Sequence, residues 1–217
     1  MQFQIIPVTP FQQNCSLLWD AHGAAALIDP GGDLPRVLGE LDRRGLTLTR
    51  ILLTHGHVDH CAATAQLVRE RPVPVEGPAR ADRFWIEALP AAAAQFGMPP
   101  AEPFEPDRWL EDGDAVRVGE ETLEVLQCPG HTPGHVVFFH RGLRCAWVGD
   151  VLFAGSIGRT DFPLGEHAAL IRSIRERLFP LGDDVRFVPG HGPMSTFGAE
   201  RRTNPFVADR LFAAAQR

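Results

Sequence analysis

The stretch Leu52-Leu53-Thr54-His55-Gly56-His57-Val58-Asp59-His60 decides the fold and the chemistry expected of this chain. Four side chains that bind divalent metal ions lie within six positions of it: His55, His57, Asp59 and His60. They follow the apolar run 51–53, which predicts a buried strand, and they precede the small and apolar residues 61–68, which predict a helix. Functional groups on a turn between rigid elements are typical of a binding or catalytic site. We therefore expect the rest of the chain to complete a metal site here.

The composition of the 217-residue chain is that of an ordinary globular protein, and we predict one domain spanning residues 1–217. The net charge of −6 and the lack of a long basic block argue against nucleic acid as a partner. The sequence contains no run of about 18 apolar residues, so no membrane span is expected. The N-terminus also lacks the pattern of a secretory signal, so a cytoplasmic location is expected.

The cysteines are far apart in the chain and form no CxxC pair, so a disulfide framework is not expected. We interpret them as small buried hydrophobic residues; they are Cys15, Cys61, Cys128 and Cys145. Cys61 is the best candidate for the alternative, a catalytic cysteine, because it adjoins His60. No separate base is implied for it.

Apolar runs and turn residues predict an alternation of strands and helices along the chain. Strands are expected at residues 2–8, 16–19, 24–28, 50–53, 73–75, 115–118, 123–126, 136–139, 145–148 and 185–188. Helices are expected at residues 33–44, 61–68, 77–87 and 166–178, with a short helical tail at the end of the chain. Residues 88–108, rich in Ala and Pro, are interpreted as a surface insertion in which no chemistry is legible. This order predicts two sheets packed face to face with helices outside, a four-layer αββα sandwich of the α/β class.

Three later turns repeat the design of the opening stretch. They are Cys128-Pro129-Gly130-His131, Val148-Gly149-Asp150 and Val188-Pro189-Gly190-His191. Each places a His or an Asp just after an apolar strand, beside a glycine that permits a tight turn. If these His and Asp residues were ordinary polar loop residues, the same pattern would not be expected at four turns. We therefore predict that the four strand ends lie together and form one metal site.

The seven candidate ligands exceed what one tetrahedral ion needs and suffice for two ions that share a carboxylate. We assign His55, His57 and His131 to the first ion and Asp59, His60 and His191 to the second, with Asp150 as the bridge. Spacing alone does not determine that division. Imidazole and carboxylate suit zinc, and also iron or manganese. His135 and Asp29 are interpreted as residues that could orient a ligand rather than bind metal.

The motif Thr-His-x-His-x-Asp-His at residues 54–60, with the later His131, Asp150 and His191, resembles the metallo-β-lactamase superfamily. The resemblance covers nearly the whole chain, and it implies the αββα fold and a binuclear hydrolase site. Within the superfamily, residues 149–162 resemble the glyoxalase II group, the hydroxyacylglutathione hydrolases, and in particular their short, single-domain bacterial type.

The chain departs from the longer glyoxalase II enzymes at two positions that hold glutathione in them. The expected Lys and Tyr are replaced by Arg159 and Asp161, the chain contains no Tyr at all, and the C-terminal helical domain is absent. The resemblance still implies a small-molecule thioester, linked to glutathione, as substrate. Arg159 is the candidate for holding a substrate carboxylate.

The Gly-Arg-Thr-Asp-Phe run at residues 158–162 is also similar to persulfide dioxygenases. That group oxidises glutathione persulfide at a single iron, which here would be held by His55, His131 and Asp150. Because that group retains the other motif residues, counting ligands does not separate the two activities. Persulfide oxidation is therefore the main alternative.

For the hydrolase, the resemblance implies that a hydroxide bridging two divalent ions attacks the thioester carbonyl. Asp59 and Asp150 are the expected catalytic carboxylates, with Asp59 orienting the hydroxide. A leaving thiolate with a solution pKa of about 8.5 needs little help from a general acid. A non-enzymatic metal-binding module is disfavoured, because a structural zinc site is normally closed by four ligands and this chain offers seven candidates. The expected assembly is a monomer or a homodimer without nucleic acid or membrane partners.

Overall fold

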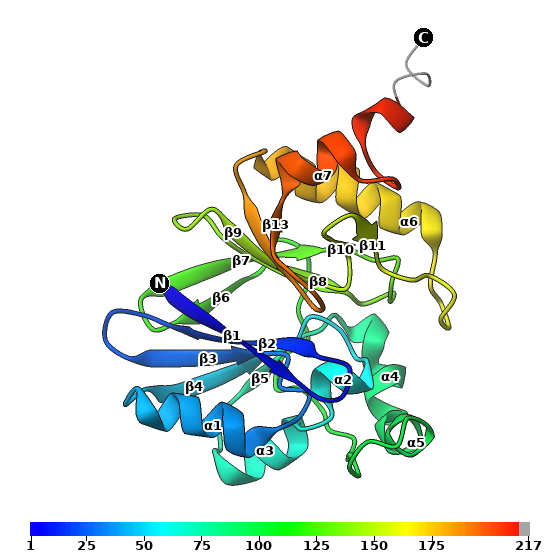
Figure 1. Ribbon diagram of the computed structural model, residues 1–217. Helices are drawn as coiled ribbons and strands as arrows, with labels where there is room; N and C mark the ends of the chain where they lie inside the picture. The colour runs from blue at the N-terminus through cyan, green and yellow to red at the C-terminus, as the bar shows by residue number, and fades with distance from the viewer. Residues whose placement is uncertain (213–217) are drawn as a thin grey trace.

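The computed structural model describes residues 1–212 and consists of two β-sheets packed face to face between layers of helices (Figure 1). This is the αββα sandwich that the sequence predicts. The predicted helical tail falls partly on residues 213–217, which lie outside the described residues. No helix within residues 1–212 is long and apolar enough to cross a membrane.

The first sheet comes from the N-terminal part of the chain and has strand order β1-β2-β3-β4-β5. Its strands are β1 (Gln2–Val8), β2 (Gln13–Trp19), β3 (Ala24–Ile28), β4 (Thr47–Leu52) and β5 (Val75–Glu76). The pairs among β1, β2 and β3 are antiparallel, whereas β3, β4 and β5 run parallel. Helices α1 (Leu34–Arg43) and α3 (Thr64–Glu70) lie beneath this sheet in Figure 1.

The second sheet has strand order β13-β12-β9-β8-β7-β6. Its strands are β6 (Ala115–Val118), β7 (Glu121–Gln127), β8 (Val136–His140), β9 (Cys145–Gly149), β12 (Arg186–Pro189) and β13 (Ser195–Thr196). Its outer face is covered by α6 (His167–Arg172), which continues as a π-helical segment, Ser173–Leu178, and by α7 (Phe197–Thr203).

Strand β8 shows why uninterrupted apolar runs occur in this sequence. Successive side chains of a strand point to opposite faces of the sheet, and both faces are buried here. Phe138 packs between the two sheets with Leu52 of the first sheet, whereas its neighbour Phe139 packs on the outer face with Leu170 of α6. Each fully buried side chain of this size contributes about 1.5–3 kcal/mol. Apolar packing on both faces of the sheet therefore holds in place the strand ends that carry the candidate ligands.

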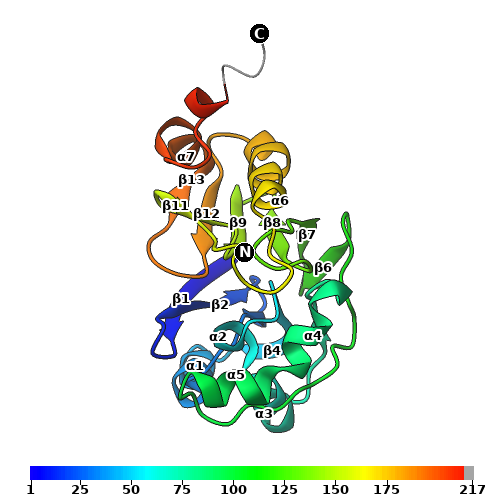
Figure 2. The ribbon, with the colours of Figure 1, turned by 90° about the vertical axis from the view of Figure 1, so that its right-hand side faces the viewer.

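Several predicted elements differ in detail from those observed. The helix expected at residues 61–68 is divided into α2 (Val58–Cys61) and α3, and the one at 77–87 consists of a 3-10 turn followed by α4 (Arg83–Glu87). The Ala-rich part of residues 88–108 forms α5 (Leu89–Gln95), and α2, α4 and α5 lie side by side at one end of the sandwich (Figure 2). A short hairpin of β10 (Leu152–Phe153) and β11 (Ser156–Ile157) was not predicted, because its strands are too short to show a period.

Candidate metal centre

The opening motif lies between the end of β4 and the start of α2, as predicted. Residues 55–57 are not helical, and α2 begins at Val58, so Asp59 and His60 fall in its single turn. His55 and His60 are fully buried, which is costly for a polar ring without partners. Gly31 has to lack a side chain because a Cβ there would lie 1.6 Å from the carbonyl oxygen of Asp59. The turn is therefore packed tightly against the β3–α1 loop.

The first group assigned from sequence is brought together by the fold. His55, His57 and His131 offer ligand atoms that all lie within 4.8 Å of one another. The Nδ1 atom of His57 is 3.0 Å from the Nε2 atom of His131, and the ring centroids of His55 and His57 are 4.8 Å apart. Three imidazoles converging in this way are a suitable donor set for a divalent transition-metal ion.

The second group is equally compact: the ligand atoms of Asp59, His60 and His191 also lie within 4.8 Å of one another. The Nε2 atom of His191 lies 3.1 Å from an oxygen of Asp59, and the Nε2 atom of His60 lies 3.8 Å from the same carboxylate. His191 comes from the turn after β12, on the opposite sheet from the motif. The two sheets therefore contribute to both groups.

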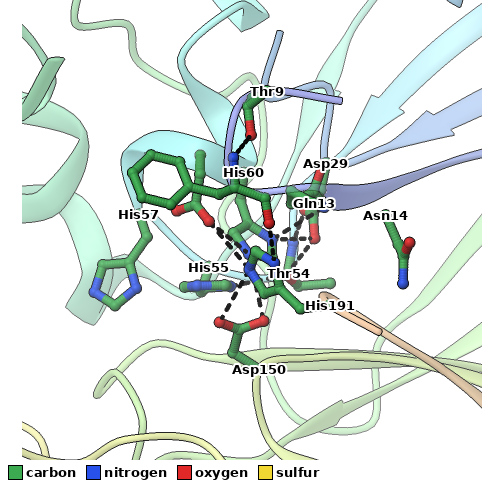
Figure 3. A network of polar contacts seen from close by, with 12 residues as sticks. Thr9, Gln13, Asn14, Asp29, Thr54, His55, His57, His60, Asp150 and His191 are labelled. Carbon is green, nitrogen blue, oxygen red and sulfur yellow. Dashed lines mark hydrogen bonds and ion pairs between the residues drawn. The ribbon is translucent and has the colours of Figure 1, made fainter. Parts of the chain in front are cut away.

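Asp150 lies between the two groups at the end of β9. One carboxylate oxygen is 3.4 Å from the Nε2 atom of His60, and the other is 3.6 Å from that of His131 and 3.7 Å from that of His191. Figure 3 shows the carboxylate of Asp150 directed toward the ring of His191, with the His60 ring behind. This position is suited to a ligand shared by both groups.

Several polar atoms at the centre have no hydrogen-bond partner among the described residues, as expected of atoms that bind metal ions. The Nε2 atoms of His55 and His60 and the Oδ1 atom of Asp150 are buried without a hydrogen bond. Buried polar groups are rarely left unpaired, and each such atom costs about 1–3 kcal/mol. Lone pairs directed at a common point are satisfied by cations, so the donor set fits one or two metal ions.

The two groups differ in their protonation states. Burial lowers the pKa of His57 to about 3 and holds the pKa values of His55 and His131 below their usual range. These rings are neutral at pH 7 and keep a lone pair for a metal. For Asp150, burial pushes the pKa upward, but the neighbouring His60 imidazole outweighs it and leaves the pKa below its ordinary value. The carboxylate is therefore ionised.

In the second group, burial lowers the pKa of His60, but the Asp150 and Asp59 carboxylates outweigh it and raise that pKa well above its usual range, and the pKa of His191 is raised as well. The second group therefore attracts a positive charge, whereas the first group offers neutral rings.

Four of the imidazoles are oriented by oxygen atoms outside the centre. The Nδ1 atom of His60 is 2.9 Å from Asp29, that of His131 is 2.7 Å from the carbonyl of Arg159, and that of His191 is 3.1 Å from the carbonyl of Phe11. The Nδ1 atom of His55 is 3.0 Å from the hydroxyl of Thr54. An Nδ1–H donated outward leaves the Nε2 lone pair facing the centre.

Asp29 connects this orientation to the backbone. It accepts hydrogen bonds from the Thr54 amide at 2.7 Å and from the Thr54 hydroxyl at 2.6 Å, besides its contact with His60. Asp29 also belongs to a compact group with His55 and His60. Because all its short contacts are to donors, we assign it the orienting role expected from sequence rather than that of a metal ligand.

Two further residues support the site: His135, which the sequence suggested as an orienting residue without defining its contacts, and Asp82, which the sequence did not indicate. His135 is fully buried, accepts the Asp150 amide at 3.1 Å on Nε2, and stacks on the ring of His55 at 4.7 Å. It therefore positions Asp150 and His55 without facing the centre. Asp82 is also fully buried and joins the two histidine loops, accepting from the Gly56 amide and the Thr132 hydroxyl on one oxygen and from the Gly134 amide on the other.

The Asp82 carboxyl is expected to make the stability of the metal-free protein depend on pH. Burial raises its pKa from 3.8 to about 6, against the opposing hydrogen bonds from Thr132, Gly56 and Gly134. A raised folded-state pKa adds stability at low pH that is lost as the pH rises through about 6. Relative to the variant Asp82→Asn, the wild-type protein should therefore lose roughly 2–3 kcal/mol of unfolding free energy between pH 4 and pH 7.5.

Urea unfolding of both proteins across that pH range measures this difference. All other groups titrate alike in the two proteins, and the unfavourable contact of the Asn amide with the Gly134 amide does not vary with pH. A constant difference between the two proteins would contradict the raised pKa of Asp82.

Arg159 lies near the site, but its guanidinium is already paired with a neighbouring carboxylate. Its Nε and Nη2 atoms contact Asp161 at 3.0 and 2.7 Å, and its guanidinium lies 4.7 Å from the centroid of the Phe162 ring. The side chain lines the cavity above the candidate metal centre. Its carbonyl, not its charge, makes the contact with His131, which no sequence pattern could indicate.

The cavity that opens over the centre has a volume of about 710 Å³. His57, Asp59, His131, Asp150 and His191 all line it. Residues from α4 and α5 line it as well, namely Trp85, Ala92, Gln95 and, just past α5, Phe96. The Ala- and Pro-rich segment, in which the sequence offered no chemistry, therefore forms one wall of the site.

The four cysteines are free and buried, as predicted. The thiol of Cys61 is directed at the carbonyl oxygens of Gly56 and His57, and burial raises its pKa well above the usual range. A buried, protonated thiol is a poor nucleophile, so Cys61 serves packing.

Comparison with known proteins agrees with the fold and with a metal-binding protein. The family model of the metallo-beta-lactamase superfamily matches residues 8–191. A hydroxyacylglutathione hydrolase, GloC, from Haemophilus influenzae is 47% identical over 95% of this chain and 98% of its own. The chain belongs to the metallo-beta-lactamase superfamily and is a metallo-hydrolase of that superfamily.

Solved structures are similar over nearly the whole chain. BLEG-1, a B3 metallo-beta-lactamase, has a TM-score of 0.88 at 35% identity, covering 95% of this chain and 99% of its own. TTHA1623 in a di-iron-bound form has a TM-score of 0.86 at 39% identity, covering 94% and 100%. ETHE1 from Myxococcus xanthus has a TM-score of 0.80 at 28% identity, covering 96% and 85%. Members of this superfamily bind one or two metal ions, in agreement with the two groups found here.

Proposed function

We propose that this protein hydrolyses a thioester of a small thiol, such as S-lactoylglutathione, at a centre of two divalent metal ions. The observation that carries the proposal is the pair of three-residue groups on either side of Asp150. Similarity over 95% of the chain to a hydroxyacylglutathione hydrolase supports the choice of a thioester. We also infer that the protein is cytoplasmic.

In this proposal, His55, His57 and His131 hold one ion, and Asp59, His60 and His191 hold the other. Asp150 serves both. Zinc suits these ligands best, with iron or manganese as alternatives. The di-iron form of the similar protein TTHA1623 supports iron as an alternative. Two such cations would lower the pKa of water to near 7 and polarise the thioester carbonyl.

The chain's own residues then position the reactants. Asp59 lines the cavity and would accept a hydrogen bond from the attacking water, which fixes the direction of its lone pair. Asp29, through His60, and the Arg159 carbonyl, through His131, keep the rings in place during the reaction. The thiolate leaves without a proton donor because its solution pKa is about 8.5. The Arg159 guanidinium is proposed to contact a carboxylate of the thiol carrier in exchange for Asp161.

Persulfide oxidation at a single iron is the second candidate. It would use only His55, His131 and Asp150, and the similarity to ETHE1 supports it less strongly than 47% identity supports the hydrolase. The two candidates differ in whether the second group of ligands is needed, and an experiment can exploit that difference.

The test measures metal content, S-lactoylglutathione cleavage and oxygen uptake with glutathione persulfide, for the wild-type protein and for His191→Ala. The His191 side chain is partly exposed, at 29%, so its truncation should spare folding. Hydrolysis with two ions, lost in the variant together with one ion, supports the proposal. Oxygen uptake with one iron per chain, retained in the variant, would replace it with the dioxygenase.

A further inference from the structure

The cavity above the metal centre has two chemically different sides. Next to His57 lie the Phe162 ring, at 4.8 Å between centroids, and the Arg159 guanidinium that covers Phe162. Next to His191 lie Phe153, at 6.4 Å between centroids, and Phe11, whose carbonyl contacts the His191 ring. Trp85 also lies against His57, at 4.5 Å between centroids, so both sides carry aromatic rings. They differ in the Arg159 guanidinium, which is paired with Asp161 on the His57 side and has no counterpart among the rings beside His191.

The side next to His191 is completed by Phe96 at the end of α5. The rings of Phe11 and Phe96 meet edge to face with centroids 5.8 Å apart, and both line the cavity. They are nevertheless 42% and 50% exposed. Exposed aromatic side chains that cluster beside a site mark a surface that binds apolar groups. Phe11 and Phe96 come from separate segments, the β1–β2 turn and the end of α5.

We propose that Phe11, Phe96 and Phe153 form an acyl-binding wall, and that the substrate is a thioester whose acyl group is apolar and longer than lactoyl. This inference rests on the proposed thioester hydrolysis. The carbonyl carbon lies over the metal centre, the acyl chain runs along this wall, and the thiol carrier extends toward Arg159. Water adds to the carbonyl carbon, the carbon–sulfur bond breaks, and the products are a carboxylic acid and a thiol.

Charge decides which half of the substrate lies on which side. A glutathione moiety carries two carboxylates and an ammonium group, which need charged or polar partners. The aromatic wall offers rings, and Arg159 is the one guanidinium among the described residues that line the cavity; the chain contains no lysine. An aliphatic chain needs no such partners and gains from every methylene removed from water.

The test is a series of S-acylglutathiones, acetyl, lactoyl, butyryl and hexanoyl, assayed on the metal-loaded protein. We expect kcat/KM to rise about fourfold for each methylene added from acetyl to hexanoyl, and to be at least about tenfold higher for hexanoyl than for lactoyl. The variant Phe96→Ala should lower the hexanoyl-to-acetyl ratio of kcat/KM about tenfold, because half of the aromatic pair is removed. Phe96 is half-exposed, so its truncation should leave the fold intact.

Phe206→Ala is the matched control, since Phe206 is 44% exposed and does not line the cavity. It should leave the ratio unchanged. A preference for lactoyl or acetyl over hexanoyl, or an unchanged ratio in Phe96→Ala, would overturn the acyl-binding wall while leaving thioester hydrolysis standing.

If the protein cleaves no thioester, the wall is still tested by binding. Ketone analogues with a methylene between the carbonyl and the sulfur resist hydrolysis, and calorimetry compares their acetyl and hexanoyl forms on the metal-loaded protein. Tighter binding of the hexanoyl form, weakened in Phe96→Ala, supports the wall. Equal affinities contradict it.

Discussion

Replacing Asp150 with alanine should abolish thioester hydrolysis and reduce bound metal from two ions per chain to at most one. Asp150 is the carboxylate that lies within 3.7 Å of His60, His131 and His191, which belong to both ligand groups. Without it, the two proposed cation sites would have no protein carboxylate in common. Losing about 4 kcal/mol of transition-state stabilisation corresponds to a rate lower by about a thousandfold, and we expect at least that.

Metal analysis by mass spectrometry and the S-lactoylglutathione assay check this prediction. Asp42→Ala is the matched control, because Asp42 is an exposed carboxylate whose contact is a weak ion pair with Arg71. The control should retain both ions and full activity. An Asp150→Ala protein with two tightly bound ions and wild-type turnover would show that this carboxylate does not bridge the ions.

Replacing Asp29 should separate stability from metal affinity. Asp29→Ala leaves two donors of Thr54 and the Nδ1–H of His60 without an acceptor, in a residue whose φ of 54° is strained for alanine. We expect a loss of about 3–5 kcal/mol in unfolding free energy. Asp29→Asn tolerates that backbone conformation and still accepts from the Thr54 amide, so its stability should fall much less.

The asparagine variant should instead weaken metal binding in the second group. Its amide NH₂ can donate to the Nδ1 atom of His60, so the neutral ring then carries its hydrogen on Nε2. The Nε2 lone pair that would bind metal is thereby lost. The affinity measured by chelator competition should fall about 10–100-fold. Asp33→Asn is the control, since Asp33 also has a positive φ, of 51°, and accepts a backbone amide, that of Thr9, away from the imidazoles. Equal effects at Asp29 and Asp33 would contradict the orienting role.

The layered fold could be predicted because its strands are buried on both faces. Such strands read as continuous apolar runs, as in residues 136–139, and the turns between them are marked by Gly, Pro and Asp. The boundaries within helical regions could not. The division between α2 and α3 and the hairpin Leu152–Ile157 depend on where the backbone packs against the site, and hydrophobic periodicity does not encode that.

The proposed ligands could be predicted because each follows a strand and belongs to a motif. The residues that support them carry no such mark. Asp82 is far in sequence from both loops that it joins, and the contact of Arg159 with His131 uses a backbone carbonyl that every residue has. Phe96 lies in a segment without regular pattern, and only the packing of α5 beside α2 and α4 brings it to the cavity.

From the sequence alone, the class of protein and the seven residues able to bind metal could be determined, because ligand type and spacing along strand ends are local properties. Only the tertiary structure shows which of the seven side chains lie together. It directs both groups of three toward Asp150, and it brings Phe11 and Phe96 together on one side of the cavity and Arg159 onto Phe162 on the other. The reason is physical: orientation of an imidazole and polarity of a cavity wall arise from contacts between segments that are distant in the chain.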